Sequence, residues 1–173
     1  LILGFLLIFI SISLISFSVW ADGLTVDKSL LPMANNPPTF YDIDGNEIEY
    51  KSDNYIKPKE IPDNLKYAFI ALEDKRFYDH NGYDTYRIAG AIAKNITKGG
   101  AVEGASTISQ QLIKNTHLNS DKTLSRKIKE MVLTKKLENS YSKEEIMELY
   151  LNAIYFGSGC YGIESASLFY FGK

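Results

Sequence analysis

The chain has 173 residues, a formal net charge of −2, and hydrophobic residues at 45% of its positions. This composition excludes intrinsic disorder, and the length suits one ordinary domain rather than several. The single cysteine, Cys160, excludes an internal disulfide and a cysteine-based zinc site, and the near-neutral charge gives no reason to expect a nucleic-acid partner.

Residues 1–20 form an apolar stretch without a charged side chain. A helix of this length spans about 30 Å, which matches a bilayer core, and Trp20 falls where an interfacial aromatic residue would lie. A cleaved signal peptide is an alternative, although its apolar run usually has about 7–15 residues, and a buried core helix is another. We predict a single transmembrane anchor over residues 1–20 that continues a segment upstream of Leu1 and leaves the remainder extracytoplasmic.

Residues 21–61 differ in composition from the rest of the chain. All five prolines lie between Pro32 and Pro62, so this region is not one long helix. The segment from Thr39 to Tyr50 alternates around Asp44-Gly45, which is typical of a small β-hairpin. We therefore predict a linker over residues 21–61 that contains this hairpin.

From residue 62 onward the sequence predicts helices. Asp63, Asp84 and Ser106 are candidate N-caps, and Ser142 with Glu145 forms a capping box. Two further helices are expected over about 122–138 and 162–170. The residues expected to face the core are Leu65, Phe69, Leu72, Ile88, Ile92, Ile96, Leu124, Ile128, Met131, Val132, Ile146, Leu149, Tyr150 and Ala153. The fold class is therefore mainly α, a helical domain on a membrane anchor.

Residues 104–115, GASTISQQLIKN, have an unusual polar inventory for a helix. A soluble helix usually carries Glu and Lys on its polar face, whereas this one carries hydroxyls, amides and one lysine. Such groups suit a substrate rich in oxygens, such as a sugar or a phosphate. Between residues 94 and 136, nine basic residues accompany three acidic ones, a field that attracts anions. A solvated basic face and a simple helix cap are the alternatives.

Two carboxylates lie near this stretch. Glu73 is expected near the end of one helix and Glu130 in the middle of another, and two carboxylates in one cleft can divide the acid and base roles. Arg126 and Lys127 precede Glu130 by four and three residues, so all three can share a helix side. From spacing alone, the commoner explanation is an exposed ion-pair ladder. His80 fits either a base or a hydrogen-bonded structural histidine.

Several motifs together resemble a known family. Residues 73–82 resemble ED-x-x-F-x-x-H-x-G, and residues 104–115 resemble G-x-S-T-I-x-Q-Q-x-x-K-N. Residues 126–130 resemble R-K-x-x-E, and residues 143–157 and 170–173 are similar to the family's later conserved stretches. In this order they resemble the peptidoglycan glycosyltransferases of family 51, which comprise monofunctional transglycosylases and the polymerase domain of bifunctional penicillin-binding proteins.

This resemblance implies a lysozyme-like fold and a peptidoglycan glycosyltransferase domain over residues 62–173. The growing glycan on its lipid diphosphate would be the donor. Lipid II, a lipid-linked disaccharide-pentapeptide diphosphate, would be the acceptor, and an inverting transfer would form β-1,4 links. The resemblance also implies the plasma membrane as location, with other cell wall synthesis and division proteins as partners. Because the family's domain continues further, we expect this one to be truncated after Lys173.

The resemblance also implies roles for individual residues. Glu73 matches the general base and Glu130 the second essential carboxylate of the catalytic pair. Lys114 and Arg126 match diphosphate-binding positions, with Lys127 assisting. Two roles remain open for Glu130: orienting Arg126 and Lys114, or holding a divalent cation, Mg²⁺ or Mn²⁺, beside the diphosphate. No organic cofactor is expected.

Further residues match positions of lesser roles in the family. Those implied to bind substrate are Ser106, Thr107, Gln110, Gln111 and Asn115. Those implied to support the motifs are Asp74, Phe77, His80 and Asn152. Residues 83–100 would approach the membrane in this family, with Tyr83, Tyr86 and Ile88 touching lipid, although ordinary helix packing explains them equally well.

Two other functions compete with polymerisation. A lysozyme-like hydrolase or lytic transglycosylase would also need a catalytic glutamate, but it has no use for the cations at Lys114 and Arg126. An inactive membrane-anchored scaffold for wall synthesis is the second alternative, and the intact set of charged motif residues counts against it.

Overall fold

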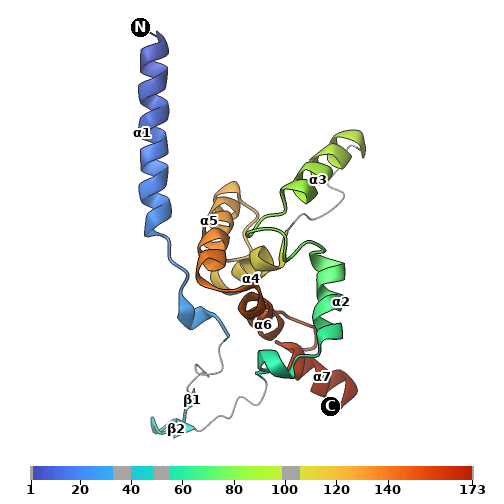
Figure 1. Cartoon of the computed structure of the whole chain (residues 1–173). Coiled ribbons are helices and arrows are strands. Elements are labelled where there is room, and N and C mark those ends of the chain that lie inside the picture. The colour runs from blue at the N-terminus through green and yellow to red at the C-terminus, as the bar shows by residue number, and fades with distance from the viewer. Residues whose placement is uncertain (1, 33–39, 49–54, 99–105, 173) are drawn as a thin grey trace.

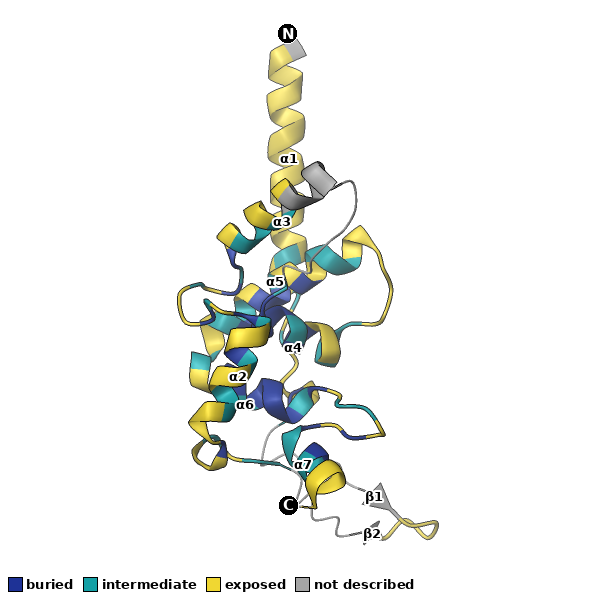
Figure 2. Ribbon diagram, turned by 90° about the vertical axis from the view of Figure 1, so that its right-hand side faces the viewer, coloured by how far each residue is buried: buried dark blue, intermediate teal, exposed yellow. Residues whose placement is uncertain are grey.

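A computed structural model describes residues 2–32, 40–48, 55–98 and 106–172, and shows a mainly helical chain (Figure 1). The first helix, α1 (Ile2–Gly23), stands apart from the helical body, with the N-terminus at its far end. By length and composition this helix is apolar enough to cross a membrane, and its large apolar side chains are exposed all round (Figure 2). It is therefore not a buried core helix.

The segment after α1 is attached to the helical body. It contains a 3-10 turn, η1 (Lys28–Leu30), followed by Leu31, which is buried in the core. Lys136 Nζ donates to the carbonyl oxygens of Asp22, at 3.0 Å, and Leu24. His117 Nε2 lies 3.1 Å from the Asp27 carbonyl oxygen. The chain leaving α1 is thus fixed by hydrogen bonds as well as by apolar packing.

Near the middle of the linker, the described residues include two short strands. The strand β1 (Phe40–Tyr41) pairs antiparallel with β2 (Glu47–Ile48), with Phe40 opposite Ile48. Asp42 Oδ1 accepts the backbone N–H groups of Asp44 and Asn46 in the intervening turn. The outer ends of the segment predicted as a hairpin, residue 39 and residues 49–50, lie outside the described residues. A second 3-10 turn, η2 (Pro58–Glu60), leads into the helical body.

In the part of the chain that the structure describes, six helices form the body of the molecule (Figure 1). They are α2 (Asp63–Glu73), α3 (Thr85–Lys98), α4 (Ile108–His117), α5 (Leu124–Ser140), α6 (Lys143–Ala153) and α7 (Ile163–Phe171). The central helix α4 packs against both α5 and α6 and contributes three fully buried side chains, Ile108, Leu112 and Ile113. Burying each stabilises the fold by roughly 1.5–3 kcal/mol. The described part of the polar stretch therefore lies mostly on a helix that packs into the core of the body.

Most predicted helices are confirmed, but parts of two predicted faces are wrong: in α2, Leu65 and Phe69 pack against the core as expected, whereas Leu72 does not. The capping box of Ser142 and Glu145 is present, and Ile146, Leu149 and Tyr150 are buried. In contrast, Leu72 and Leu124 are each 77% exposed, and Met131 is 40% exposed. In α5 the buried face is instead formed by Glu130, Leu133, Thr134 and Leu137. The predicted glycine stop at residues 99–100 and the side chains of Ile92 and Ile96 lie outside the described residues.

Candidate active site

Asp74 joins two of the sequence motifs. It follows the last residue of α2 and is completely buried. Its Oδ2 accepts the backbone N–H of Ile108 at 3.0 Å, and both carboxylate oxygens lie 3.0 Å from His80 Nε2. A carboxylate at a helix N-terminus is stabilised by the unpaired N–H groups there. Asp74 therefore holds the start of α4 against the end of α2, and it binds His80, whose side chain is only 5% exposed.

The N-cap of α4 is Thr107, not Ser106 as the sequence predicted. Thr107 Oγ1 accepts the backbone N–H of Gln110 at 3.2 Å, and Gln110 Oε1 accepts the backbone N–H of Thr107 at 3.1 Å. The same hydroxyl donates to the carbonyl of Gly82 at 2.7 Å. Gly82 has φ +94°, and a Cβ there would lie 3.1 Å from Thr134 Cγ2, so glycine is required. Thr107 and Gln110 thus form the N-terminal capping box of α4.

Glu130 lies at the centre of a buried charge cluster. Only 1% of the residue is exposed. Arg126 Nη1 donates to its Oε2 at 2.8 Å, Lys127 Nζ donates to Oε1, and Gln110 Nε2 lies 3.3 Å from Oε1. Lys127 Nζ is also 3.4 Å from Ser106 Oγ. The exposed ion-pair ladder favoured by spacing alone is therefore wrong, because the carboxylate is buried, although the Lys127 side chain is still 38% exposed.

Glu73, the last residue of α2, has a different environment. Its Oε2 accepts one hydrogen bond from Gln111 Nε2 at 2.8 Å, and Gln111 Oε1 in turn accepts from the Tyr150 hydroxyl at 3.2 Å. Glu73 lines a cleft of about 340 Å³, together with Arg87, Ser106, Gln111, Lys114 and Asn115. A carboxylate, a lysine, an arginine and neutral hydrogen-bonding groups therefore share one solvent-accessible hollow.

Among the described residues that line the Glu73 cleft, Glu130 is not included. Arg126 lines a separate one of about 410 Å³ between the end of α4 and the start of α5. The link between the two regions runs through adjacent residues of α4, because Gln110 contacts Glu130 and Gln111 contacts Glu73. Ser106 provides a second link, since it lines the Glu73 cleft and contacts Lys127.

Two of the residues expected to support the site have structural contacts. Phe77 is fully buried in the core. Asn152 Nδ2 donates to the Ile56 carbonyl at 2.9 Å, and its Oδ1 accepts the Ile56 N–H at 3.0 Å. Asn152 therefore holds the end of the linker against α6.

Arg87 and Tyr150 were not proposed as site residues from the sequence. Arg87 Nη1 donates to the Glu73 backbone carbonyl. It is placed by Asp84, whose Oδ1 accepts the Arg87 backbone N–H at 2.8 Å and caps α3. Arg76 donates to both Asp84 oxygens and, as the main cause, lowers the pKa of Asp84 to about 2. One feature of the sequence sets Arg87 apart and could have drawn attention to it: it is the only charged residue between positions 85 and 93.

The tyrosines considered for lipid contact divide into two cases. The hydroxyl of Tyr83 donates to the Met131 carbonyl on α5, and burial raises its pKa to about 12. Tyr83 is thus part of the helix packing. Tyr86 is 76% exposed, and its ring lies 4.3 Å from the Arg76 guanidinium carbon. Only Tyr86 of the two presents its side chain to the surroundings.

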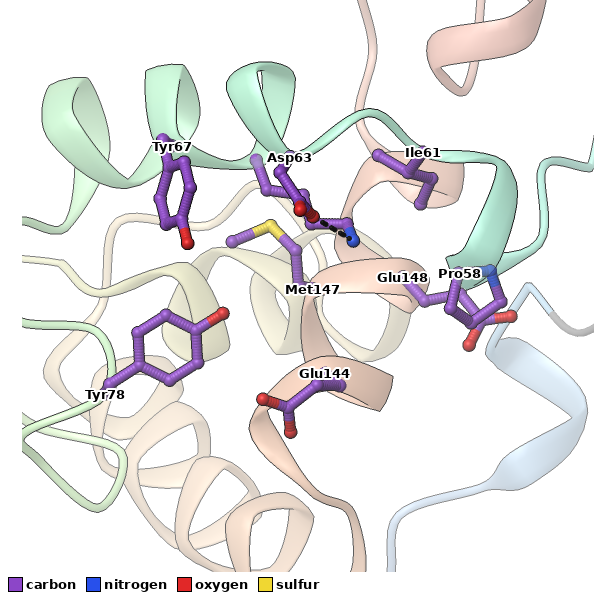
Figure 3. Close-up of a pocket in the computed structure, with 9 residues that line it drawn as sticks. Pro58, Ile61, Asp63, Tyr67, Tyr78, Glu144, Met147 and Glu148 are labelled. Atoms are coloured by element: carbon purple, nitrogen blue, oxygen red, sulfur yellow. Dashed lines mark hydrogen bonds and ion pairs between the residues drawn. The ribbon is translucent and has the colours of Figure 1, made fainter.

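A further pocket, of about 210 Å³, lies between η2, α2 and α6 (Figure 3). Tyr67, Tyr78 and Met147 line it together with Asp63, Glu144 and Glu148. The pKa of Tyr78 is raised, mainly by burial. Its lining includes none of the residues predicted to bind or act on substrate. Its three carboxylates outnumber its one lysine, Lys66, which pairs with Asp63 at 3.1 Å, so the pocket suits a diphosphate poorly. The Glu73 cleft is therefore the better candidate site for an anionic substrate.

Comparison with known proteins gives a consistent family. The family model described as "Transglycosylase" matches residues 42–173. Penicillin-binding protein 1F of Bacillus subtilis (strain 168) is 53% identical over 118 residues, 68% of this chain and 16% of that protein. Penicillin-binding protein 1A/1B of the same organism is 45% identical over 162 residues, 91% of this chain and 18% of the relative.

A third relative extends the comparison to another genus. Penicillin-binding protein 1A of Clostridium tetani (strain Massachusetts / E88) is 46% identical over 162 residues, which cover 88% of this chain and 20% of that protein. The chain thus spans about a fifth or less of the length of these three relatives.

Proposed function

The chain belongs to the transglycosylase family, and from this premise we propose that it polymerises the glycan chains of peptidoglycan. The observation that carries the proposal is the cleft in which Glu73 lies with Lys114, Arg87 and neutral hydrogen-bond donors. A carboxylate beside fixed cations suits a reaction in which one oxygen loses a proton while an anionic group departs. We take residues 62–173 as the catalytic domain, residues 21–61 as a linker and residues 1–20 as its anchor.

The proposed step transfers a sugar with inversion. Glu73 accepts the proton from the 4-hydroxyl of lipid II, and that oxygen forms a bond to the anomeric carbon of the growing glycan. The bond from this carbon to the lipid diphosphate breaks, and the diphosphate leaves with the electron pair. A well-placed general base typically accelerates such a step by about 10²–10⁴-fold. The result is a β-1,4 link and a glycan longer by one disaccharide.

The departing diphosphate would be held by cations. Lys114 lines the Glu73 cleft, and Arg126 and Lys127 converge on Glu130 beyond Gln110. Fixed positive charge where negative charge develops contributes strongly to catalysis because it needs no reorganisation. Ser106, Gln111 and Asn115 line the same cleft and would donate to or accept from sugar and phosphate oxygens. Thr107 and Gln110 would act mainly by setting the geometry of α4.

For Glu130 we favour the orienting role over metal binding. Its two carboxylate oxygens accept hydrogen bonds from Arg126, Lys127 and Gln110, so they are engaged before any metal arrives. A divalent cation, Mg²⁺ or Mn²⁺, would therefore be bound chiefly by oxygens of the substrate diphosphate, which are ligands that such hard cations prefer. No step of the proposed mechanism passes through the metal.

The proposed setting is the outer face of the plasma membrane. The apolar helix α1 fits a single-pass anchor, and lipid-linked substrates would reach the domain from the same bilayer. Other cell wall synthesis and division proteins are the proposed partners. This orientation would be tested by labelling a cysteine introduced at the exposed residue Asn139 with a membrane-impermeant reagent in intact cells.

The activity is tested with detergent-solubilised protein, labelled lipid II and Mg²⁺, with products separated on a gel. The expected result is a ladder of glycan chains that added muramidase removes. The same assay is run on a chain extended past Lys173 to the length of the relatives. Absence of a ladder from both proteins would overturn the proposal in favour of an inactive scaffold.

A further inference from the structure

We propose that Tyr150 is a positioning residue for Glu73: its hydroxyl orients the Gln111 side-chain amide so that the amide N–H, rather than the amide oxygen, faces the Glu73 carboxylate. The proposal rests on the proposed function in that Glu73 is taken as the proton acceptor. It assigns a role to a residue that the sequence identified only as part of the core.

Three helices contribute one residue each to this chain of hydrogen bonds. Tyr150 lies on α6, Gln111 on α4 and Glu73 at the end of α2. The Tyr150 hydroxyl is 3.2 Å from Gln111 Oε1, and Gln111 Nε2 is 2.8 Å from Glu73 Oε2. Tyr150 is 2% exposed, and its ring packs edge-on against Phe69, with centroids 6.1 Å apart. The hydroxyl is therefore held in place by packing and has little freedom to turn away.

The orientation of the amide matters because its two ends have the same shape and opposite hydrogen-bonding character. The NH₂ end donates, which favours the ionised carboxylate of Glu73. The oxygen end accepts, which would favour the protonated carboxyl group. Burial, together with the charges of Glu73 and Asp74, raises the pKa of Tyr150 well above its ordinary value, so the hydroxyl keeps its proton and remains a donor. A donor at Tyr150 selects the amide oxygen as its partner and leaves the NH₂ end for Glu73.

The other charged groups around Glu73 are independent of Tyr150. Asp74 is bound to His80 and to the start of α4. Arg87 contacts the Glu73 backbone carbonyl rather than its carboxylate. Lys114 lines the cleft from the same helix as Gln111. Removing the Tyr150 hydroxyl therefore changes only the orientation of the Gln111 amide that contacts the Glu73 carboxylate. The neighbouring charged groups stay in place.

The test is the variant Tyr150→Phe, which keeps the ring and removes only the hydroxyl. Its kcat/KM for lipid II polymerisation is measured from about pH 5 to 9 against wild type. The acid limb is expected to move to higher pH by about half to one unit. Below that limb the rate would fall by roughly three- to tenfold, and at high pH the two proteins would converge, since Glu73 is ionised in both. Tyr161→Phe, an exposed tyrosine on the same part of the fold, is the matched control and should leave the profile unchanged.

A second readout does not depend on turnover. The carboxyl groups are labelled with ¹³C-glutamate, the Glu73 signal is assigned with Glu73→Gln, and its titration is followed by NMR in wild type and Tyr150→Phe. An upward shift of the Glu73 pKa in the variant, absent when Gln111 is replaced by Leu in both backgrounds, is the expected result. An unshifted titration, or an equal loss of rate at every pH, would reject the positioning role. Failure of wild type to polymerise would reject the proposed function while leaving this titration decisive.

Discussion

The two motif carboxylates, Glu73 and Glu130, are surrounded very differently. Glu130 is 1% exposed and accepts from an arginine, a lysine and an amide. Glu73 lines an open cleft and accepts from a single neutral amide. A base must be able to gain a proton during the reaction, and a carboxylate bound to two cations resists this. This difference supports the proposal that Glu73 transfers the proton and that Glu130 places the cations.

The sharpest way to break this comparison is to neutralise Glu73. Glu73→Gln nearly preserves shape and should lower the polymerisation rate by about 10²–10⁴-fold, because only the general base is removed. Thermal unfolding should change little, since the side chain borders solvent. Glu164→Gln on α7 is the matched control, with activity near wild type. A Glu73→Gln protein that polymerised lipid II at the normal rate would refute the assignment.

Neutralising Glu130, unlike neutralising Glu73, should lower the stability of the fold. Glu130→Gln leaves Arg126 and Lys127 without their shared carboxylate in a largely buried position. Breaking a buried pair typically costs about 3–5 kcal/mol, and we expect about 2–3 kcal/mol here because Lys127 is partly exposed. Urea unfolding of the detergent-solubilised protein measures this difference. An unfolding midpoint equal to that of wild type would mean that the cluster contributes nothing to the fold.

The loop that follows Glu73 provides a pH-dependent test. The pKa of Asp84 is lowered to about 2 in the folded protein, mainly by its hydrogen bonds with Arg76. Because this value lies below that of the unfolded chain, the ionised form stabilises the fold above about pH 4, and the stabilisation is lost as the pH falls toward 2. After allowing for screening at Arg76, the contribution is about 1–2 kcal/mol.

Asp84→Asn should remove that acid-dependent part of the stability, measured as the difference in unfolding free energy between pH 6 and pH 3. Asp44→Asn, in the exposed turn between the strands, is the control and should retain it. An equal pH dependence in wild type and Asp84→Asn would contradict the role of the Arg76 contact. A confirmed effect would show that the Arg76–Asp84 ion pair stabilises the region near Glu73, independently of the cluster around Glu130.

The smallest expected effect comes from exchanging the cation beside Glu130. Arg126 donates to Glu130 Oε2 through Nη1 and to the Asp121 carbonyl through Nε. A lysine keeps the charge but has no planar fork to reach both acceptors. Arg126→Lys should therefore lower kcat/KM by about tenfold, chiefly through KM for lipid II, while Lys135→Arg at an exposed position of α5 should not. An unchanged KM would argue against a diphosphate contact.

The sequence predicted α6 well because its local signals agree. The box at Ser142 and the apolar residues at helical spacing all favour one start and one buried face. The buried face of α5 was wrong because charged residues were assigned to solvent, whereas Glu130 is buried with Arg126 and Lys127 as its partners. Whether a charged residue is buried with a partner of opposite charge depends on how the helices pack. Hydrophobic periodicity in the sequence does not predict it.

The residues of the candidate site also fall into two groups, those that the sequence motifs identified and those that only the packing of the helices reveals. The motifs identified Glu73, Gln111 and Lys114, which line one cleft. Arg87 and Tyr150 could not be placed, because their partners lie on other helices and depend on how those helices pack. The N-cap at Thr107 was missed for a similar reason. Its hydroxyl is fixed by the distant carbonyl of Gly82 as well as by local capping geometry.

Lys136 gives the junction between α1 and the body a mechanical consequence. Its ammonium group binds carbonyls at the C-terminal end of α1, where a cation is favoured, and it projects from α5, the helix that also carries Glu130. Together with the burial of Leu31 in the core, these hydrogen bonds attach the end of α1 directly to the helical body. If α1 is the anchor that we propose, its orientation and that of α5 are coupled through Lys136.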